Sequence, residues 1–107
     1  MPTYNKLVRD KIPEIIEATG KTFTTRILSE QEYLIELKNK SFEELEEYHD
    51  AENREEAIEE LADLMEVVHA FAKSHDTSLV EIEDIRLKKC IKKGSFDKKV
   101  LLIGVED

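Results

Sequence analysis

The sequence predicts a mainly α-helical domain, a helical bundle that is completed by association with further copies of the chain. Apolar residues recur at helical spacing over long stretches, three capping patterns open those stretches, and 38% of the residues are charged against 40% that are apolar. A chain of 107 residues forms one domain, here residues 1–107. Its core is expected to be modest, which favours self-association.

Three capping patterns mark the starts of the long helices, each a Ser or Asn followed three residues later by Glu. They are Ser29 with Glu32, Asn53 with Glu56, and Ser78 with Glu81. The helices that they open are predicted over residues 30–48, 54–74 and 79–92, and Gly94 ends the last one. A shorter helix over residues 14–18 follows Pro13, which suits a first helical turn.

The second long helix carries apolar residues on two sides. One stripe contains Ile58, Leu61, Ala62, Met65, Val68, His69 and Ala72, and the other contains Leu64, Val67 and Phe71. A helix that is apolar on two sides needs cover on two sides, and one chain supplies few helices. We therefore expect a homodimer or a homotetramer in which a second subunit packs against this helix.

Two short segments have the composition of strands. Residues 22–28, TFTTRIL, are rich in β-branched and aromatic residues, and Phe23, Thr25 and Ile27 occupy alternate positions. Residues 99–105, KVLLIGV, form a continuous apolar run of strand length. The two segments are predicted to pair as a minimal two-stranded sheet.

Four carboxylates fall into two pairs with a spacing of three residues, Glu44 with Glu47 and Glu60 with Asp63. Residues three apart lie on the same face of a helix, so two antiparallel helices would bring all four carboxylates together. Such a cluster repels itself unless a divalent cation lies within it. Because the ligands are all oxygen, they favour Mg²⁺, Mn²⁺ or Ca²⁺ over Zn²⁺.

Charge and composition exclude several classes of partner. The formal net charge of −9 disfavours nucleic acid or an anionic membrane as a partner. No apolar run approaches the length needed to span a bilayer, the N-terminus does not resemble a signal peptide, and Cys90 is the only cysteine. We therefore expect a protein of the reducing cytoplasm.

The two acidic pairs carry a resemblance to a known family. The motif EELEE at residues 43–47, twelve further residues and then ELAD at residues 60–63 resemble the E-E-x-x-E, spacer, E-x-x-D signature of the MazG-like all-α nucleoside triphosphate (NTP) pyrophosphohydrolases. The opening YNKLVRDKIPEII and the segment KKGSFDKKVLLIG are similar to the start and the basic tail of small house-cleaning pyrophosphatases of that superfamily, including phosphoribosyl-ATP pyrophosphohydrolase-like proteins. Together these stretches cover most of the chain.

The resemblance implies an enzyme that hydrolyses the α–β phosphoanhydride of an NTP to a nucleoside monophosphate and pyrophosphate. It implies Mg²⁺, with Mn²⁺ as an alternative, held by the two carboxylate pairs. Glu43 and Glu59 are the candidates for orienting the attacking water. The substrate-binding candidates are Lys6, Arg9, Asp10, Lys92 and Lys93.

Two alternatives remain open from the sequence. The same acids would support hydrolysis of phosphoribosyl-ATP. A non-catalytic helical adaptor would instead use its acidic face to bind a basic protein partner, and its carboxylates would serve only for solubility. Binding of divalent cations separates the adaptor from the two enzymes.

Overall fold

The computed structural model describes residues 2–107, and within them the only regular secondary structure is helical, which confirms the predicted mainly α-helical class. The helices are α1 (Ile12–Ala18), α2 (Glu30–His49), α3 (Arg54–Ser74) and α4 (Leu79–Lys93). Each lies within two residues of its predicted bounds. None of these helices combines the length and the apolarity needed to span a lipid bilayer.

The ends of the helices follow from local hydrogen bonds. At the start of α2 the Ser29 hydroxyl accepts from the backbone N–H of Glu32, and the Glu32 carboxylate accepts from the backbone N–H of Ser29, which completes the capping box. Asn53 and Ser78 accept in the same way at the starts of α3 and α4. Gly94 ends α4 with a φ of 86°, a backbone conformation that favours glycine.

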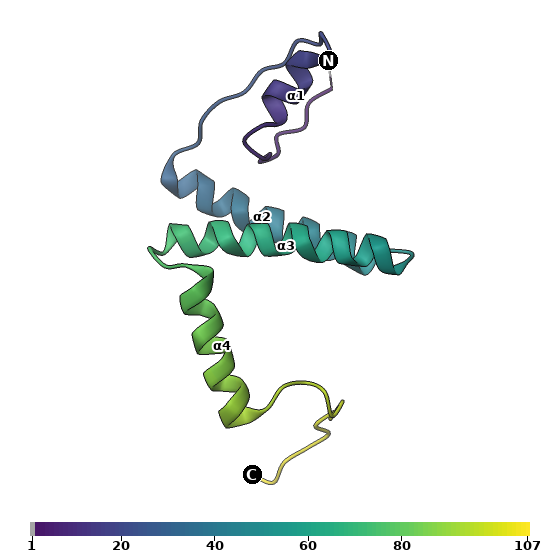
Figure 1. Ribbon diagram of the computed structural model, residues 1–107, viewed down its shortest axis with the longest axis vertical. Helices are drawn as coiled ribbons and strands as arrows, with labels where there is room; N and C mark the ends of the chain where they lie inside the picture. The colour runs from purple at the N-terminus through teal and green to yellow at the C-terminus, as the bar shows by residue number, and fades with distance from the viewer. Residues whose placement is uncertain (1) are drawn as a thin grey trace.

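Helices α2 and α3 form an antiparallel hairpin, which is the centre of the molecule (Figure 1). The N-terminal segment, residues 2–11, and α1 lie on one side of this hairpin, whereas α4 leaves its end on the opposite side. The radius of gyration is 18.4 Å, against about 13 Å for a compact chain of this length. The single chain is therefore extended.

The apolar core of the described residues is small. Only Leu37, Val67 and Ala72 are buried apolar residues, and all three lie on the hairpin. Val67 belongs to one predicted apolar stripe of α3 and Ala72 to the other. Residues 2–107 leave much of the remaining apolar surface uncovered.

The predicted β-pair is not formed within the single chain. Residues 22–28 and 99–105 are irregular, and residues 2–107 contain no strand. The first segment lies between α1 and α2, and the second lies beyond α4 on the other side of the hairpin (Figure 1). A strand is stable only when its backbone groups find a partner, and neither segment reaches the other.

Candidate metal and phosphate site

The four predicted metal-binding carboxylates come together on one face of the hairpin, which we call the acidic face. Helix α2 contributes Glu44 and Glu47, and α3 contributes Glu60 and Asp63. One oxygen of each carboxylate lies within 4.8 Å of one oxygen of every other. The spacing of three residues places each pair on one side of its helix, and the antiparallel packing of the hairpin joins the pairs.

Two of these carboxylates keep a buried oxygen without a hydrogen-bond partner. Glu44 is the one buried charged residue among residues 2–107, with 6% of its surface exposed. Its Oε2 atom and Oε2 of Glu60 are buried and accept no hydrogen bond. Buried carboxylate oxygens are costly when they are left unsatisfied, so each of them can accept a further ligand.

Crowding and burial raise the pKa of two of the carboxylates, Glu60 and Glu44. A hydrogen bond shared with Glu47, helped by burial and by the neighbouring negative charges, raises the pKa of Glu60 to about 7. Burial is the largest cause that raises the pKa of Glu44, Glu47 adds to it, and Lys40 opposes it. Both shifts have the sign expected for carboxylates that are partly buried and held close to one another.

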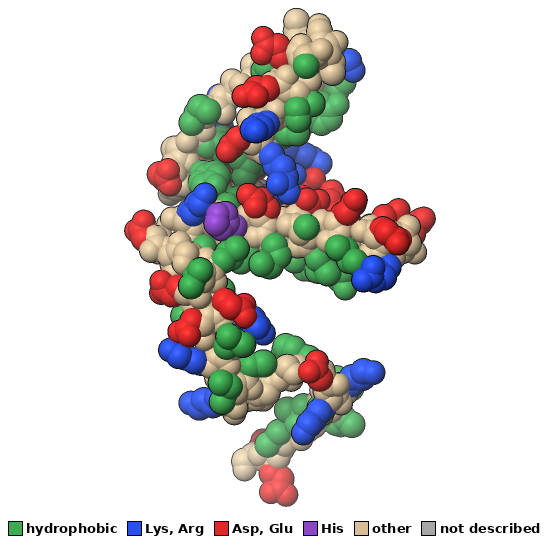
Figure 2. Space-filling model, viewed as in Figure 1, with side chains coloured by type: hydrophobic (Ala, Val, Ile, Leu, Met, Phe, Trp, Pro, Cys, Tyr) green, Lys and Arg blue, Asp and Glu red, His purple; other side chains and the backbone are tan. Residues whose placement is uncertain are grey.

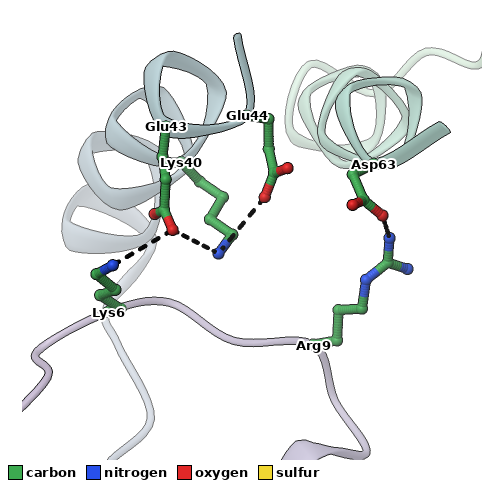
Figure 3. Close-up of polar contacts among 6 residues, drawn as sticks. All are labelled: Lys6, Arg9, Lys40, Glu43, Glu44 and Asp63. Atoms are coloured by element: carbon green, nitrogen blue, oxygen red, sulfur yellow. Dashed lines mark hydrogen bonds and ion pairs between the residues drawn. The ribbon is translucent and has the colours of Figure 1, made fainter. Parts of the chain in front are cut away.

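Cations of the same chain border the acidic face (Figure 3). From the N-terminal segment, Nη2 of Arg9 lies 2.7 Å from Oδ1 of Asp63, and Nζ of Lys6 lies 3.4 Å from Oε1 of Glu43. Arg9 therefore binds one of the predicted metal ligands directly. Glu47 and Glu60 form none of the ion pairs found in residues 2–107, so the negative charge of the cluster is only partly neutralised.

Lys40 is a residue of this site that the sequence analysis did not select. Its Nζ atom lies 3.6 Å from Oε1 of Glu43 and 3.6 Å from Oε1 of Glu44, and its side chain is 24% exposed. Lysine three and four residues before two acids is a spacing that forms ion pairs on a helix. That spacing was visible in the sequence and could have identified Lys40.

A small open pocket lies where the N-terminal segment meets the hairpin. Its volume is about 220 Å³, and its walls contain both cationic and anionic side chains. It is lined by Val8, Arg9, Ile12, Lys40, Glu44 and Asp63. A second pocket of about 240 Å³ lies beside it and shares Lys40. The arrangement can bind a cation through its acids and an anion through its bases at the same time.

The other predicted residues lie outside the cluster. Glu43 borders it but is already paired with Lys6 and Lys40, and Glu59 is an exposed residue of α3. Asp10 is exposed and takes part in none of the ion pairs found in residues 2–107. Lys92 and Lys93 are exposed at the end of α4, across the hairpin from the N-terminal segment (Figure 1).

Comparison with known proteins finds one partial relative. An uncharacterized protein of Mycolicibacterium smegmatis is 46% identical to this chain over 54 residues, which are 50% of this chain and 55% of that protein. The match thus spans about half the length of the relative. No family profile and no solved structure matches this chain.

Proposed function

We propose that this protein is a Mg²⁺-dependent NTP pyrophosphohydrolase of the MazG-like type, which hydrolyses the α–β phosphoanhydride and releases a nucleoside monophosphate and pyrophosphate. The observation that supports this most directly is the group of four carboxylates, whose oxygens lie within 4.8 Å of one another. Hard oxygen ligands from two helices suit Mg²⁺, and Mn²⁺ is the alternative.

The residues present fit a divalent cation. Glu44 and Glu60 each keep a buried oxygen that lacks a partner, and these oxygens are the natural first ligands. Glu47 and Asp63 complete the proposed set from the same two helices. When bound, Mg²⁺ would neutralise phosphate charge and favour ionisation of a nearby water.

The cations beside the cluster would bind the phosphates of the substrate. The guanidinium of Arg9 can form a two-pronged contact with a phosphate, whereas the ammonium groups of Lys6 and Lys40 act as point charges. The pocket of about 220 Å³ is smaller than the roughly 300–1,000 Å³ of most ligand sites, which suits the phosphate chain rather than a whole nucleotide. Asp10, Lys92 and Lys93 remain candidates for contacts with the rest of the substrate.

In the proposed reaction a water oxygen attacks the α-phosphorus, the bond from that phosphorus to the bridging oxygen breaks, and pyrophosphate leaves. Arg9 and Lys40 would hold the phosphates in line for this displacement. Glu43 or Glu59 would orient the water and accept its proton. Glu43 is the candidate nearer to the cluster, and its ion pairs with Lys6 and Lys40 hold its carboxylate in place.

The proposal includes an assembly and a compartment. A homodimer or a homotetramer would complete the helical bundle, and residues 22–28 and 99–105 would find strand partners only between copies. A lone free cysteine, Cys90, suits the reducing cytoplasm.

The test is release of pyrophosphate from a panel of NTPs, deoxynucleotides, damaged nucleotides and phosphoribosyl-ATP, each with Mg²⁺, with Mn²⁺ and with a chelator. Pyrophosphate release that requires metal supports the proposal, and the preferred substrate separates a house-cleaning enzyme from a phosphoribosyl-ATP hydrolase. The adaptor alternative uses the same acidic face, which would bind a basic protein partner. It would be supported if metal neither binds nor permits turnover on any substrate.

A further inference from the structure

The side of the hairpin opposite the acidic face is apolar and uncovered. We call it the apolar face; its six side chains are 43% to 70% exposed, and they are Ile35, Phe42 and Leu45 of α2 with Ile58, Leu61 and Met65 of α3. Their helical spacing places them roughly opposite the acids. Figure 2 shows acidic side chains along the edge of the hairpin that faces α1, and hydrophobic side chains along the edge that faces α4.

The C-terminal arm, residues 94–107, is the second uncovered apolar region. Phe96 and the run from Val100 to Ile103 are between 74% and 96% exposed. The backbone N–H of Lys99 donates to the carbonyl of Phe96 over 3.2 Å, which forms a turn before the apolar run. The arm is separated from its own hairpin by the length of α4, 15 residues or about 22 Å (Figure 1).

The exposed area is large for a single chain of this size. The accessible surface is 10,015 Å², whereas a compact monomer of 12.4 kDa would have about 6,100 Å². The excess of roughly 3,900 Å² far exceeds the ~800 Å² that each partner buries in a standard interface. An excess of that size matches an intertwined, obligate assembly.

Charge complementarity identifies a second copy as the partner. Between Glu30 and Glu66 the chain has fifteen acids and three bases, whereas between Arg86 and Lys99 it has seven bases and one acid. Five of these seven bases lie on α4, directly before the arm, and only Lys98 and Lys99 lie within it. The basic end of α4, which carries the arm, is therefore attracted to an acidic hairpin, and each copy carries one of each. Two copies related by a two-fold axis satisfy both surfaces at once, and no third protein is needed.

We propose that two copies of this chain exchange their C-terminal arms, so that the arm of each copy covers the apolar face of the other. The exchange buries the run from Val100 to Ile103 against Met65 and its neighbours and leaves the acidic face open. It specifies how the proposed dimer forms, and it does not depend on the proposed hydrolase activity.

The first experiment is sedimentation equilibrium of the full-length protein without nucleotide. Wild type is expected at twice 12.4 kDa, whereas Leu102→Lys in the arm and Met65→Glu on the face each raise the dimer Kd at least 100-fold, because every change occurs twice in the dimer. Val80 is 81% exposed on α4 outside both surfaces, so Val80→Lys and Val80→Glu should change the Kd less than threefold. Circular dichroism verifies that each variant keeps its helices.

The second experiment separates exchange from other contacts. Mixing the Leu102→Lys and Met65→Glu proteins creates a heterodimer with one unchanged apolar pair and one Lys–Glu pair, so mixing should restore dimerisation. A monomeric wild type, arm variants that dimerise normally, or a mixture that stays monomeric would each overturn the proposal. If the arm binds its own hairpin, the double variant forms the Lys–Glu pair within one chain and mixing has no effect.

Discussion

The two faces of the α2–α3 hairpin are built on the same helices, but they differ in the contacts that other residues of the chain make with them. The acidic face receives Arg9 and Lys6 from the N-terminal segment and Lys40 from α2 itself. The apolar face receives nothing from residues 2–107, and its six side chains stay between 43% and 70% exposed. The chain thus supplies cations for its own acids, whereas residues 2–107 supply no cover for the apolar face.

The difference teaches that charge and apolar area impose different demands on a short chain. A single cation 2.7 Å from Asp63 satisfies a carboxylate, and a segment without regular secondary structure supplies it here. Covering an apolar face requires a whole packed element, and residues 2–107 contain only four helices, one of them with seven residues. Substitutions that change one face and leave the other unchanged test whether the two faces are independent.

The largest effect is expected on the acidic face. Glu60→Gln or Asp63→Asn should lower kcat for pyrophosphate release by about 100- to 1,000-fold, because each removes charge from the proposed metal site. Glu55→Gln removes an exposed acid from the first turn of the same helix and serves as the control. Steady-state kinetics with Mg²⁺ measures the effect, and full activity in both site variants would contradict the assignment.

Metal should stabilise the fold through the same acids. At about 100 times its Kd, Mg²⁺ or Mn²⁺ should add about 2.7 kcal/mol to the free energy of unfolding, and it should raise Tm by roughly 10 °C or more. A chelator should reverse the shift, and Asp63→Asn should abolish it. Differential scanning fluorimetry measures Tm. A Tm that neither metal raises would contradict a metal site on the acidic face.

Replacing Lys40 should change the binding of substrate and the binding of metal in opposite directions. Lys40→Met is expected to raise KM about tenfold with little change in kcat, because it removes one charge-assisted contact with the substrate. The same change should tighten binding of Mn²⁺ alone, because Lys40 no longer competes for Glu44. Lys38→Met, at an exposed position of α2, is the control. A Lys40→Met protein that weakens both kinds of binding would indicate a structural role.

The metal-free protein should become less stable as the pH rises from about 4.5 to about 7. Glu60 has a pKa of about 7 when folded and an ordinary value of 4.5, so the folded state binds the proton more tightly. Its contribution therefore favours folding at the lower end of this window and is unfavourable above it. Glu60→Gln should flatten this slope in urea titrations, whereas Glu55→Gln should leave it unchanged.

The smallest effect on the metal should come from the apolar face. Phe42 is 70% exposed, and Phe42→Ser should weaken self-association while it changes the Kd for Mn²⁺ less than about threefold, because distant sites act additively. Electron paramagnetic resonance with Mn²⁺, combined with sedimentation, measures both quantities on one sample. A joint loss of metal binding and assembly would show that the two faces are coupled.

The sequence alone determined the helices and the pairing of the acids along each helix. Ser29, Asn53, Ser78 and Gly94 act through hydrogen bonds to nearby backbone groups and through local backbone preference, so their positions set the helix ends directly. Glu44 with Glu47, and Glu60 with Asp63, share a face because of helical geometry. Lys40 follows the same local rule, so its place beside the acids could have been predicted from the sequence.

Only the tertiary structure decided what meets across the chain. It brought Arg9 to Asp63, 54 residues apart, and it left Lys92, Lys93 and Glu59 outside the cluster. It also left residues 22–28 and 99–105 irregular, although their composition favours strands. Contacts between distant segments depend on the packing of whole helices, which local spacing does not encode, and a strand forms only where that packing supplies its partner.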